Sequence, residues 1–211
     1  MTFQSGDTGI DESRLRVLMR KVWRRIALRN LTGTDNHKQL DRLYAMQDPW
    51  QMESLKEQFR FEMTNALVQA KVGRVGTLLE LGCGEGHQSQ HLATLCDQLY
   101  GLDVSPRAVE RARKRLPAAL FDVGTLPLVP RTPPGGRFDL VVACEVLYYM
   151  SDIATAVKAM NELGDACLVT FFGPSAGIVA KHVDGIPGIE RGWFFHDPYA
   201  WLWVFWRPER R

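Results

Sequence analysis

The sequence predicts an α/β fold: one mainly parallel sheet flanked by helices and preceded by a helical N-terminal segment. Three observations predict it. From Thr77 onward, short apolar runs alternate with helical patterns, which is typical of βαβ units. A turn rich in glycine, residues 82–86, joins the first apolar run to the next helix. The chain of 211 residues, 45% hydrophobic and 24% charged, has the length and composition of one globular domain.

Residues 1–72 are expected to form a helical extension and lid, and residues 73–211 the sheet domain. Apolar residues spaced by three and four predict a helix over 11–30, and a second helical stretch ends near Met46, before Asp48-Pro49-Trp50. A third helix is expected to begin near Ser54, with Ser54 and Glu57 as a capping box and Gly73 at its end. Its apolar stripe consists of Met52, Leu55, Phe59, Met63 and Leu67.

The sheet domain is expected to contain seven strands. Ser105 and Pro106 open one helix as N-cap and first helical residue, and the proline- and glycine-rich stretch 129–137 predicts a surface loop. The last two strands are expected to form an antiparallel hairpin at the sheet edge. The expected strands cover 77–81, 98–103, about 118–121, 138–144, 166–173, 193–196 and 199–206.

Composition and charge exclude several classes of protein. No apolar run approaches the roughly 20 residues of a membrane span, and the N-terminus lacks the layout of a signal peptide, so we expect a cytoplasmic protein. The four cysteines lack metal-site spacing and are expected to be reduced core thiols; we expect no metal. The net charge of +2 argues against a dedicated nucleic-acid binder, although residues 1–30 carry seven bases against three acids. A solvated face is the preferred interpretation of that basic arm.

The glycine turn is the main candidate for cofactor binding. Gly82, Cys83, Gly84 and Gly86 follow an apolar strand, and glycines let the backbone approach a ligand closely. This spacing fits either a dinucleotide or S-adenosylmethionine (SAM). Glu80 and Glu85 place carboxylates beside the turn, which disfavours a pyrophosphate and favours the cationic SAM.

Acidic residues at the ends of the next two strands complete the predicted cofactor site. Asp103, followed by Val104, ends a strand about 20 residues beyond the glycines, where a carboxylate can accept both ribose hydroxyls. Helix capping is the weaker reading of Asp103, because Ser105 already serves as the cap. Asp122, next to Val123, could accept a hydrogen bond from the adenine amino group, although aspartates are also common in loops.

Three motifs over about residues 77–173 resemble class I SAM-dependent methyltransferases: E-L-G-C-G-E-G, L-D-V-S-P-R-A and F-D-L-V-V-A-C-E-V-L-Y-Y. The chain is most similar to the nodulation N-methyltransferase (NodS-like) family, through Asp48-Pro49-Trp50, residues 106–108 and residues 145–149. The resemblance implies a Rossmann-like sheet of order 3-2-1-4-5-7-6 with an N-terminal helical cap. It also implies an amino-sugar nitrogen on a deacetylated chitooligosaccharide as the methyl acceptor. The longer N-terminal arm and the aromatic C-terminal tail depart from that family.

The acceptor site is expected at the end of the fourth strand. Glu145, which also faces the cofactor, could hold an amine or take its proton, while Tyr148 and Tyr149 could contact the sulfonium or merely pack a helix. His87, His182 and His196 could each act as a base, with His182 slightly favoured over the other two, although packed or exposed histidines are more common. A lid is a second open hypothesis: Trp50 and Tyr44 could close over the cofactor, or Asp48-Pro49-Trp50 could be a simple helix break.

The sequence therefore predicts a SAM-dependent methyltransferase that releases S-adenosylhomocysteine and acts on a small molecule, foremost an amine nitrogen. The alternatives are a small-molecule O-methyltransferase in a natural-product pathway and an RNA-directed enzyme that uses the basic arm. Strand 199–206 carries aromatic residues on both sides. One face can pack on the sheet core, and the other could meet a helix, a carbohydrate ring or a second subunit, of which a homodimer through the C-terminal hairpin is the plainest explanation.

Overall fold

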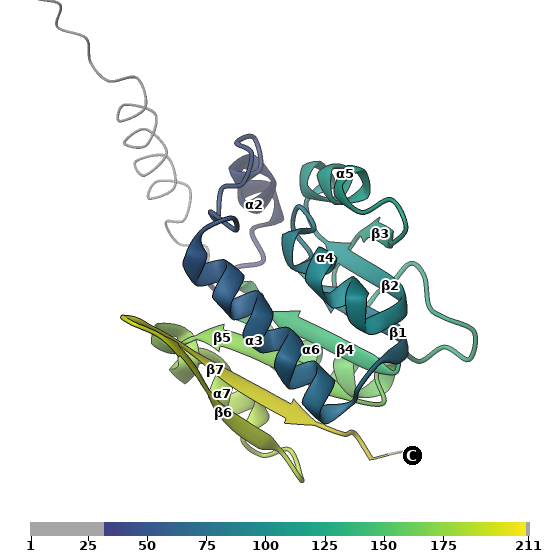
Figure 1. The fold of residues 1–211 in the computed structure, drawn as a ribbon, viewed down its shortest axis with the longest axis vertical. Helices are drawn as coiled ribbons and strands as arrows, with labels where there is room; N and C mark the ends of the chain where they lie inside the picture. The colour runs from purple at the N-terminus through teal and green to yellow at the C-terminus, as the bar shows by residue number, and fades with distance from the viewer. Residues whose placement is uncertain (1–31, 210–211) are drawn as a thin grey trace, which may run out of the picture.

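The computed structural model, which describes residues 32–209, contains a seven-stranded sheet with helices on both faces (Figure 1). The strand order is β3-β2-β1-β4-β5-β7-β6. Strands β1 to β5 run parallel to one another, and β7 runs antiparallel between β5 and β6. The predicted order and the C-terminal hairpin are therefore confirmed. The strands are β1 Val75–Leu81, β2 Cys96–Asp103, β3 Leu120–Val123, β4 Leu140–Cys144, β5 Cys167–Phe172, β6 Glu190–His196 and β7 Tyr199–Trp206.

Two apolar cores lie on the two faces of the sheet, because successive side chains of a strand point to opposite sides. Leu78 of β1 packs with residues of α3, α4 and α5, whereas Leu79 and Leu81 pack with residues of α6 and α7. Figure 1 shows α3, α4 and α5 on the near side of the sheet. The described helices are α2 His37–Leu43, α3 Leu55–Lys71, α4 His87–Leu92, α5 Pro106–Arg115, α6 Ile153–Leu163 and α7 Ala176–Val183.

The aromatic strand β7 is covered by helices of its own chain. Trp206 is fully buried in the core beneath α6 and α7, and its indole N–H donates to Asn161 of α6 at 2.6 Å. Phe205 is buried on the opposite face, in the core that α3 covers. The next strand, β6, does expose Trp193 and Phe195, whose stacked rings lie 6.1 Å apart. The predicted homodimer stays a prediction.

Helix α3 differs from the sequence prediction in two respects. Ser54 is its N-cap but makes no side-chain capping bond, and Glu57 pairs with Arg60 instead of closing a capping box. The predicted apolar stripe is also not the buried face, since Leu55 is 82% exposed. The buried residues are Glu57, Arg60, Phe61, Thr64 and Val68. Both errors have one cause: α3 turns a charged face inward, which apolar periodicity cannot reveal.

Most other local predictions are confirmed. Ser105 caps α5 by accepting from the Ala108 N–H, and all four cysteines are free and buried. Strand β3 begins two residues later than expected, so Asp122 lies within it. The predicted helix over 11–30 and its basic face lie outside the described residues. Within residues 32–209, no helix is long and apolar enough to cross a membrane.

Candidate functional site

A cavity of about 420 Å³ lies at the carboxyl ends of β1, β2 and β4, under the segment that joins α2 to α3. In sheets of this kind, ligands bind where the strand order reverses, here between β1 and β4. The volume falls in the range of small-molecule sites. The predicted site residues that line it are Tyr44, Trp50, Glu80, Gly82, Cys83, Gly84, Asp103, Val104, Glu145, Tyr148 and Tyr149.

The glycine turn packs too closely for side chains. Gly82 has a φ of +69°, and a Cβ there would lie 2.6 Å from a methyl carbon of Val146. Gly86, which does not line the cavity, caps α4 at a φ of +80°, and its Cβ would lie 3.1 Å from Ala112 of α5. The first glycine therefore brings β1 against the segment after β4, and the last brings α4 against α5.

Asp103 ends β2 with its carboxylate held by two backbone donors. Oδ2 accepts from the Gly84 N–H at 2.9 Å, and Oδ1 accepts from the Ser105 N–H at 2.9 Å. Burial raises the pKa of Asp103, while these two N–H groups lower it. The carboxylate is thus fixed against the glycine turn at the cavity wall.

Tyr44 and Trp50 form one unit over the glycine turn. The Trp50 indole N–H donates to the Tyr44 hydroxyl at 3.0 Å, and that hydroxyl lies 3.0 Å from the position of a Cβ on Gly84. The Trp50 ring also lies 5.8 Å from that of Tyr149. The segment between α2 and α3 therefore covers the turn, as a lid would.

Glu145 immediately follows β4 and has an unusual backbone, with a φ of +59°. Its carboxylate accepts from the Thr170 hydroxyl at 3.1 Å, the Phe172 N–H at 2.9 Å and the Tyr148 hydroxyl at 3.2 Å. A non-glycine residue at positive φ costs free energy and is concentrated at functional sites. Burial raises the pKa of Glu145, and the charge of Arg60 partly offsets this.

Arg60 is a cavity residue that sequence reasoning missed. Its side chain is 1% exposed, donates to Glu57 at 2.8 Å and to Gln88 at 2.6 Å, and lines the cavity from α3. The only available signal was polar spacing, because Glu57, Arg60 and Thr64 share one side of the predicted helix.

Glu80 adds a buried carboxyl group to the same cavity. It is 2% exposed and accepts a hydrogen bond from the Ser89 hydroxyl. Burial raises its pKa to about 8, and the nearby Asp103 contributes to the rise. The group is therefore poised to become ionised when a cation binds beside it.

Three other predicted residues do not line the cavity. Asp122 forms ion pairs with Arg131 at 3.0 Å and Arg113 at 3.7 Å, and Val123 is 43% exposed. His182 lies on α7, which packs against α6, and is not among the residues that line the cavity. The structure does not bring these residues together with the glycine turn.

Comparison with known proteins identifies one family. Residues 32–179 match the sequence model of nodulation protein S (NodS). The chain is 32% identical over 152 residues to nodulation protein S of Sinorhizobium fredii, covering 71% of this chain and 67% of that protein. It is 34% identical over 134 residues to nodulation protein S of Bradyrhizobium diazoefficiens, covering 63% and 64%. The chain thus spans about two thirds of the length of these relatives.

A solved structure shares the fold. The N-methyltransferase NodS from Bradyrhizobium japonicum WM9, in complex with S-adenosylhomocysteine, superposes with a TM-score of 0.69 at 22% identity. The match covers 84% of this chain and all of that one. The cavity described above lies at the strand ends where this fold binds its ligands.

Proposed function

The chain belongs to the nodulation protein S (NodS) family of SAM-dependent methyltransferases, and we propose that it methylates an amine nitrogen of a small molecule, foremost an amino sugar. The proposal has two parts. One concerns which residues hold the cofactor. The other concerns how the acceptor is held and loses its proton.

The cavity residues fit SAM group by group. Asp103 offers a carboxylate for the ribose hydroxyls, and the glycine turn offers backbone close to the ligand. The amino-acid tail carries both charges: Arg60 is a buried cation for its carboxylate, and Glu80 is a buried acid for its ammonium. When bound, SAM supplies a methyl group activated by a sulfonium. Asp122 and Val123, predicted as adenine contacts, lie outside the cavity lining and keep no part in this proposal.

One observation carries the acceptor assignment: the Glu145 carboxylate is held in the cavity by three donors on a strained backbone. An amine acceptor must be unprotonated to act as a nucleophile, so a fixed carboxylate beside it can accept the proton. The raised pKa of Glu145 brings its proton affinity closer to that of an amine. Tyr148 keeps the carboxylate oriented by donating to it, and the aromatic walls exclude water. Since methyl transfer depends strongly on alignment, this fixed geometry suits the reaction.

A paired acceptor assay tests the reaction. We expect methyl transfer from isotopically labelled SAM to glucosamine oligosaccharides and none to their fully N-acetylated counterparts, which keep every hydroxyl but lack the free amine. The reverse preference, or equal rates on both, would identify an oxygen acceptor and overturn the proposal.

Calorimetric titration tests the cofactor part separately. We expect micromolar binding of SAM and S-adenosylhomocysteine, no binding of NAD, and at least about 100-fold weaker binding in Asp103→Ala, which loses two charge-assisted ribose bonds. Asp122→Ala is the matched control and should bind like the wild type. Equal losses in both variants would contradict the assignment of Asp103.

A further inference from the structure

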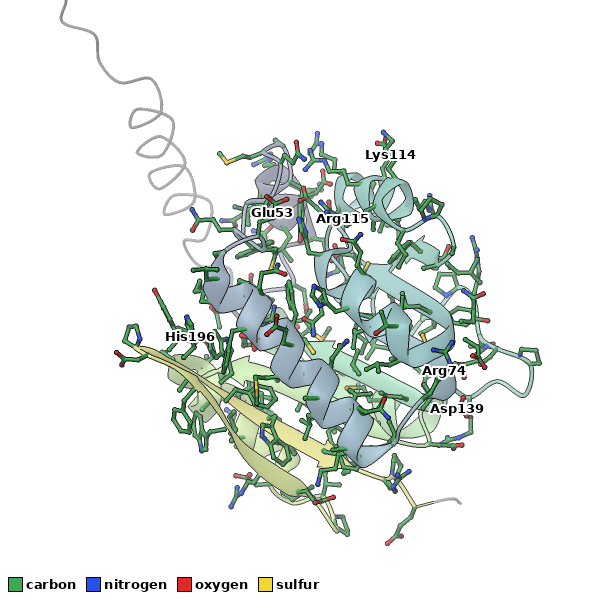
Figure 2. The ribbon with its side chains drawn as sticks, in the orientation of Figure 1. Glu53, Arg74, Lys114, Arg115, Asp139 and His196 are labelled. Atoms are coloured by element: carbon green, nitrogen blue, oxygen red, sulfur yellow. The ribbon has the colours of Figure 1, made fainter. Side chains whose placement is uncertain are left out.

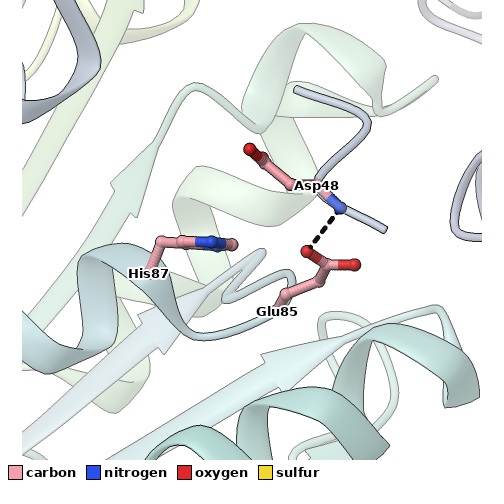
Figure 3. A group of neighbouring side chains, drawn as sticks. All are labelled: Asp48, Glu85 and His87. Carbon is pink, nitrogen blue, oxygen red and sulfur yellow. Dashed lines mark hydrogen bonds between the residues drawn. The ribbon is translucent and has the colours of Figure 1, made fainter. Parts of the chain in front are cut away.

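Three metal-ligand side chains meet between the lid segment and the start of α4 (Figure 3). Asp48, Glu85 and His87 each offer one ligand atom, and these atoms all lie within 4.8 Å of one another. The Asp48 N–H also donates to Glu85 Oε2 at 2.9 Å, which joins the two segments. Because Asp48 is far from the other two in the sequence, no motif spacing could have revealed this group.

His87 provides an independent indication of a ligand. Its side chain is only 7% exposed, yet its Nε2 has no hydrogen-bond partner. The nearest acid, Glu53, lies 4.0 Å away, beyond hydrogen-bond distance. Figure 3 shows the imidazole extending toward the space between Asp48 and Glu85. A buried ring nitrogen without a partner costs free energy, and a bound cation would satisfy it.

The charges around the group favour a divalent cation. Three carboxylates face it, from Asp48, Glu53 and Glu85, and two arginines of α5 lie alongside. Arg111 pairs with Glu85 Oε1, and Arg115 donates to the Glu85 carbonyl at 2.9 Å. Figure 2 shows Glu53 and Arg115 at the same end of the molecule. With a neutral histidine the group carries a net charge of about −1, which attracts a dication.

The protonation state of His87 also suits metal binding. Burial lowers its pKa, and the charge of Arg115 lowers it further, although Asp48, Glu85 and Glu53 act in the opposite sense. Burial thus favours the neutral imidazole, which is the form that binds a metal.

We propose that His87, Asp48 and Glu85 bind one divalent transition-metal ion, with the exposed Glu53 as a fourth ligand. One imidazole and several carboxylates suit Zn²⁺ and Mn²⁺. Tetrahedral bonds of about 2.1 Å hold their donors roughly 3.4 Å apart, so the side chains need to move inward by about 1 Å. The ion would fasten the lid, which contains Asp48, to the turn that contains Glu85. The three ligands also line the cavity described above, but the proposal does not depend on which acceptor is methylated.

Metal titration of the full chain tests the proposal without SAM. After treatment with EDTA and buffer exchange, Zn²⁺ alone is titrated by calorimetry, and Co²⁺ is followed by its visible absorption. We expect one ion per chain at micromolar affinity. His87→Gln and Asp48→Asn should each weaken binding at least about tenfold. His91→Gln is the matched control, since His91 lies on the same helix with its ring against Phe61, 5.1 Å away.

The outcomes separate cleanly. Stoichiometric binding that is lost in His87→Gln and kept in His91→Gln supports the site. Binding weaker than about 1 mM in the wild type, or binding unchanged in His87→Gln, overturns it. Should His87→Gln fail to fold, Glu53→Gln replaces it, because Glu53 is 77% exposed and its loss should still weaken Zn²⁺ binding several-fold. Unchanged affinity in both Glu53→Gln and Asp48→Asn would likewise overturn the proposal.

Discussion

The two sides of the cavity present different chemical groups. On the side of β1 and β2, the wall consists of backbone and two carboxyl groups: Glu80, and Asp103, to which Gly84 donates. On the side of β4 and α3, the wall consists of charged side chains, chiefly the buried Arg60 and the half-buried Glu145. The first wall is made by two consecutive strands and the turns that follow them. The second is assembled from elements far apart in the chain.

The largest effect should come from breaking the charged wall. Arg60→Met takes the 2.8 Å partner from the buried Glu57 and leaves it only the partly exposed Lys56 at 3.1 Å. Removing one member of a buried pair costs about 3–5 kcal/mol of unfolding free energy, and we expect the lower end of that range because Lys56 remains. Urea denaturation measures this loss. The double variant Glu57→Gln with Arg60→Met should regain part of it, because no uncompensated charge remains. A single-variant loss below about 1 kcal/mol would show that this wall is not held by its charges.

The comparison also explains which features the sequence could predict. The strand order, the hairpin and the Ser105 cap follow from local patterns and from the resemblance of the glycine turn to a known fold. The turn and Asp103 follow for the same reason, since each strand end delivers its residues to one edge of a parallel sheet. These features depend on residues close together in the chain.

The charged wall could not be predicted in the same way. Apolar periodicity predicted that the buried face of α3 contains Leu55. Arg60 is buried instead, because partners distant in the sequence, such as Gln88, satisfy its hydrogen bonds. The group formed by Asp48, Glu85 and His87 has the same character, since it exists only once the lid packs on the turn. Local sequence patterns therefore fail where residues distant in the chain come together to form a binding site.

The pH dependence of the unfolding free energy tests the side of the cavity formed by β1 and β2, through Glu80. Its pKa is about 8 in the folded protein and 4.5 in an unfolded chain, so the folded state keeps a proton that the unfolded state releases. Its contribution to stability is full below pH 4.5 and is lost as pH rises to about 8. Between pH 5 and pH 8, the unfolding free energy of Glu80→Gln should therefore rise by roughly 3 kcal/mol relative to that of the wild type. This is less than the full pKa difference implies, because the site relaxes around the charge.

Urea denaturation at several pH values measures this difference for Glu80→Gln. Glu62→Gln, at an exposed position on α3, is the control and should follow the wild-type curve. Parallel curves of unfolding free energy against pH for Glu80→Gln and the wild type would show that the pKa of Glu80 is not raised in the folded protein.

Glu145→Gln separates the chemistry from the binding. The substitution keeps the size of the side chain but removes the carboxylate, so kcat should fall about 100-fold, or about 2.7 kcal/mol, while the SAM dissociation constant changes less than threefold. Part of the loss should return at higher pH, where solvent deprotonates the amine. Steady-state rates across pH measure this, with the exposed Glu162→Gln as control. A kcat within threefold of the wild type would remove Glu145 as the proton acceptor.

The smallest effect tests whether the lid belongs to the cofactor side. Trp50→Phe removes the indole N–H that donates to Tyr44 but keeps an aromatic ring near Tyr149. One hydrogen bond of about 1 kcal/mol predicts a roughly fivefold weaker SAM affinity by calorimetry, with kcat unchanged. Trp193→Phe, on the exposed face of β6, should change neither quantity. A lower kcat with an unchanged SAM affinity would instead place Trp50, together with Tyr149, on the acceptor side of the cavity. In that case the lid would act on the methyl-transfer step and not on cofactor binding.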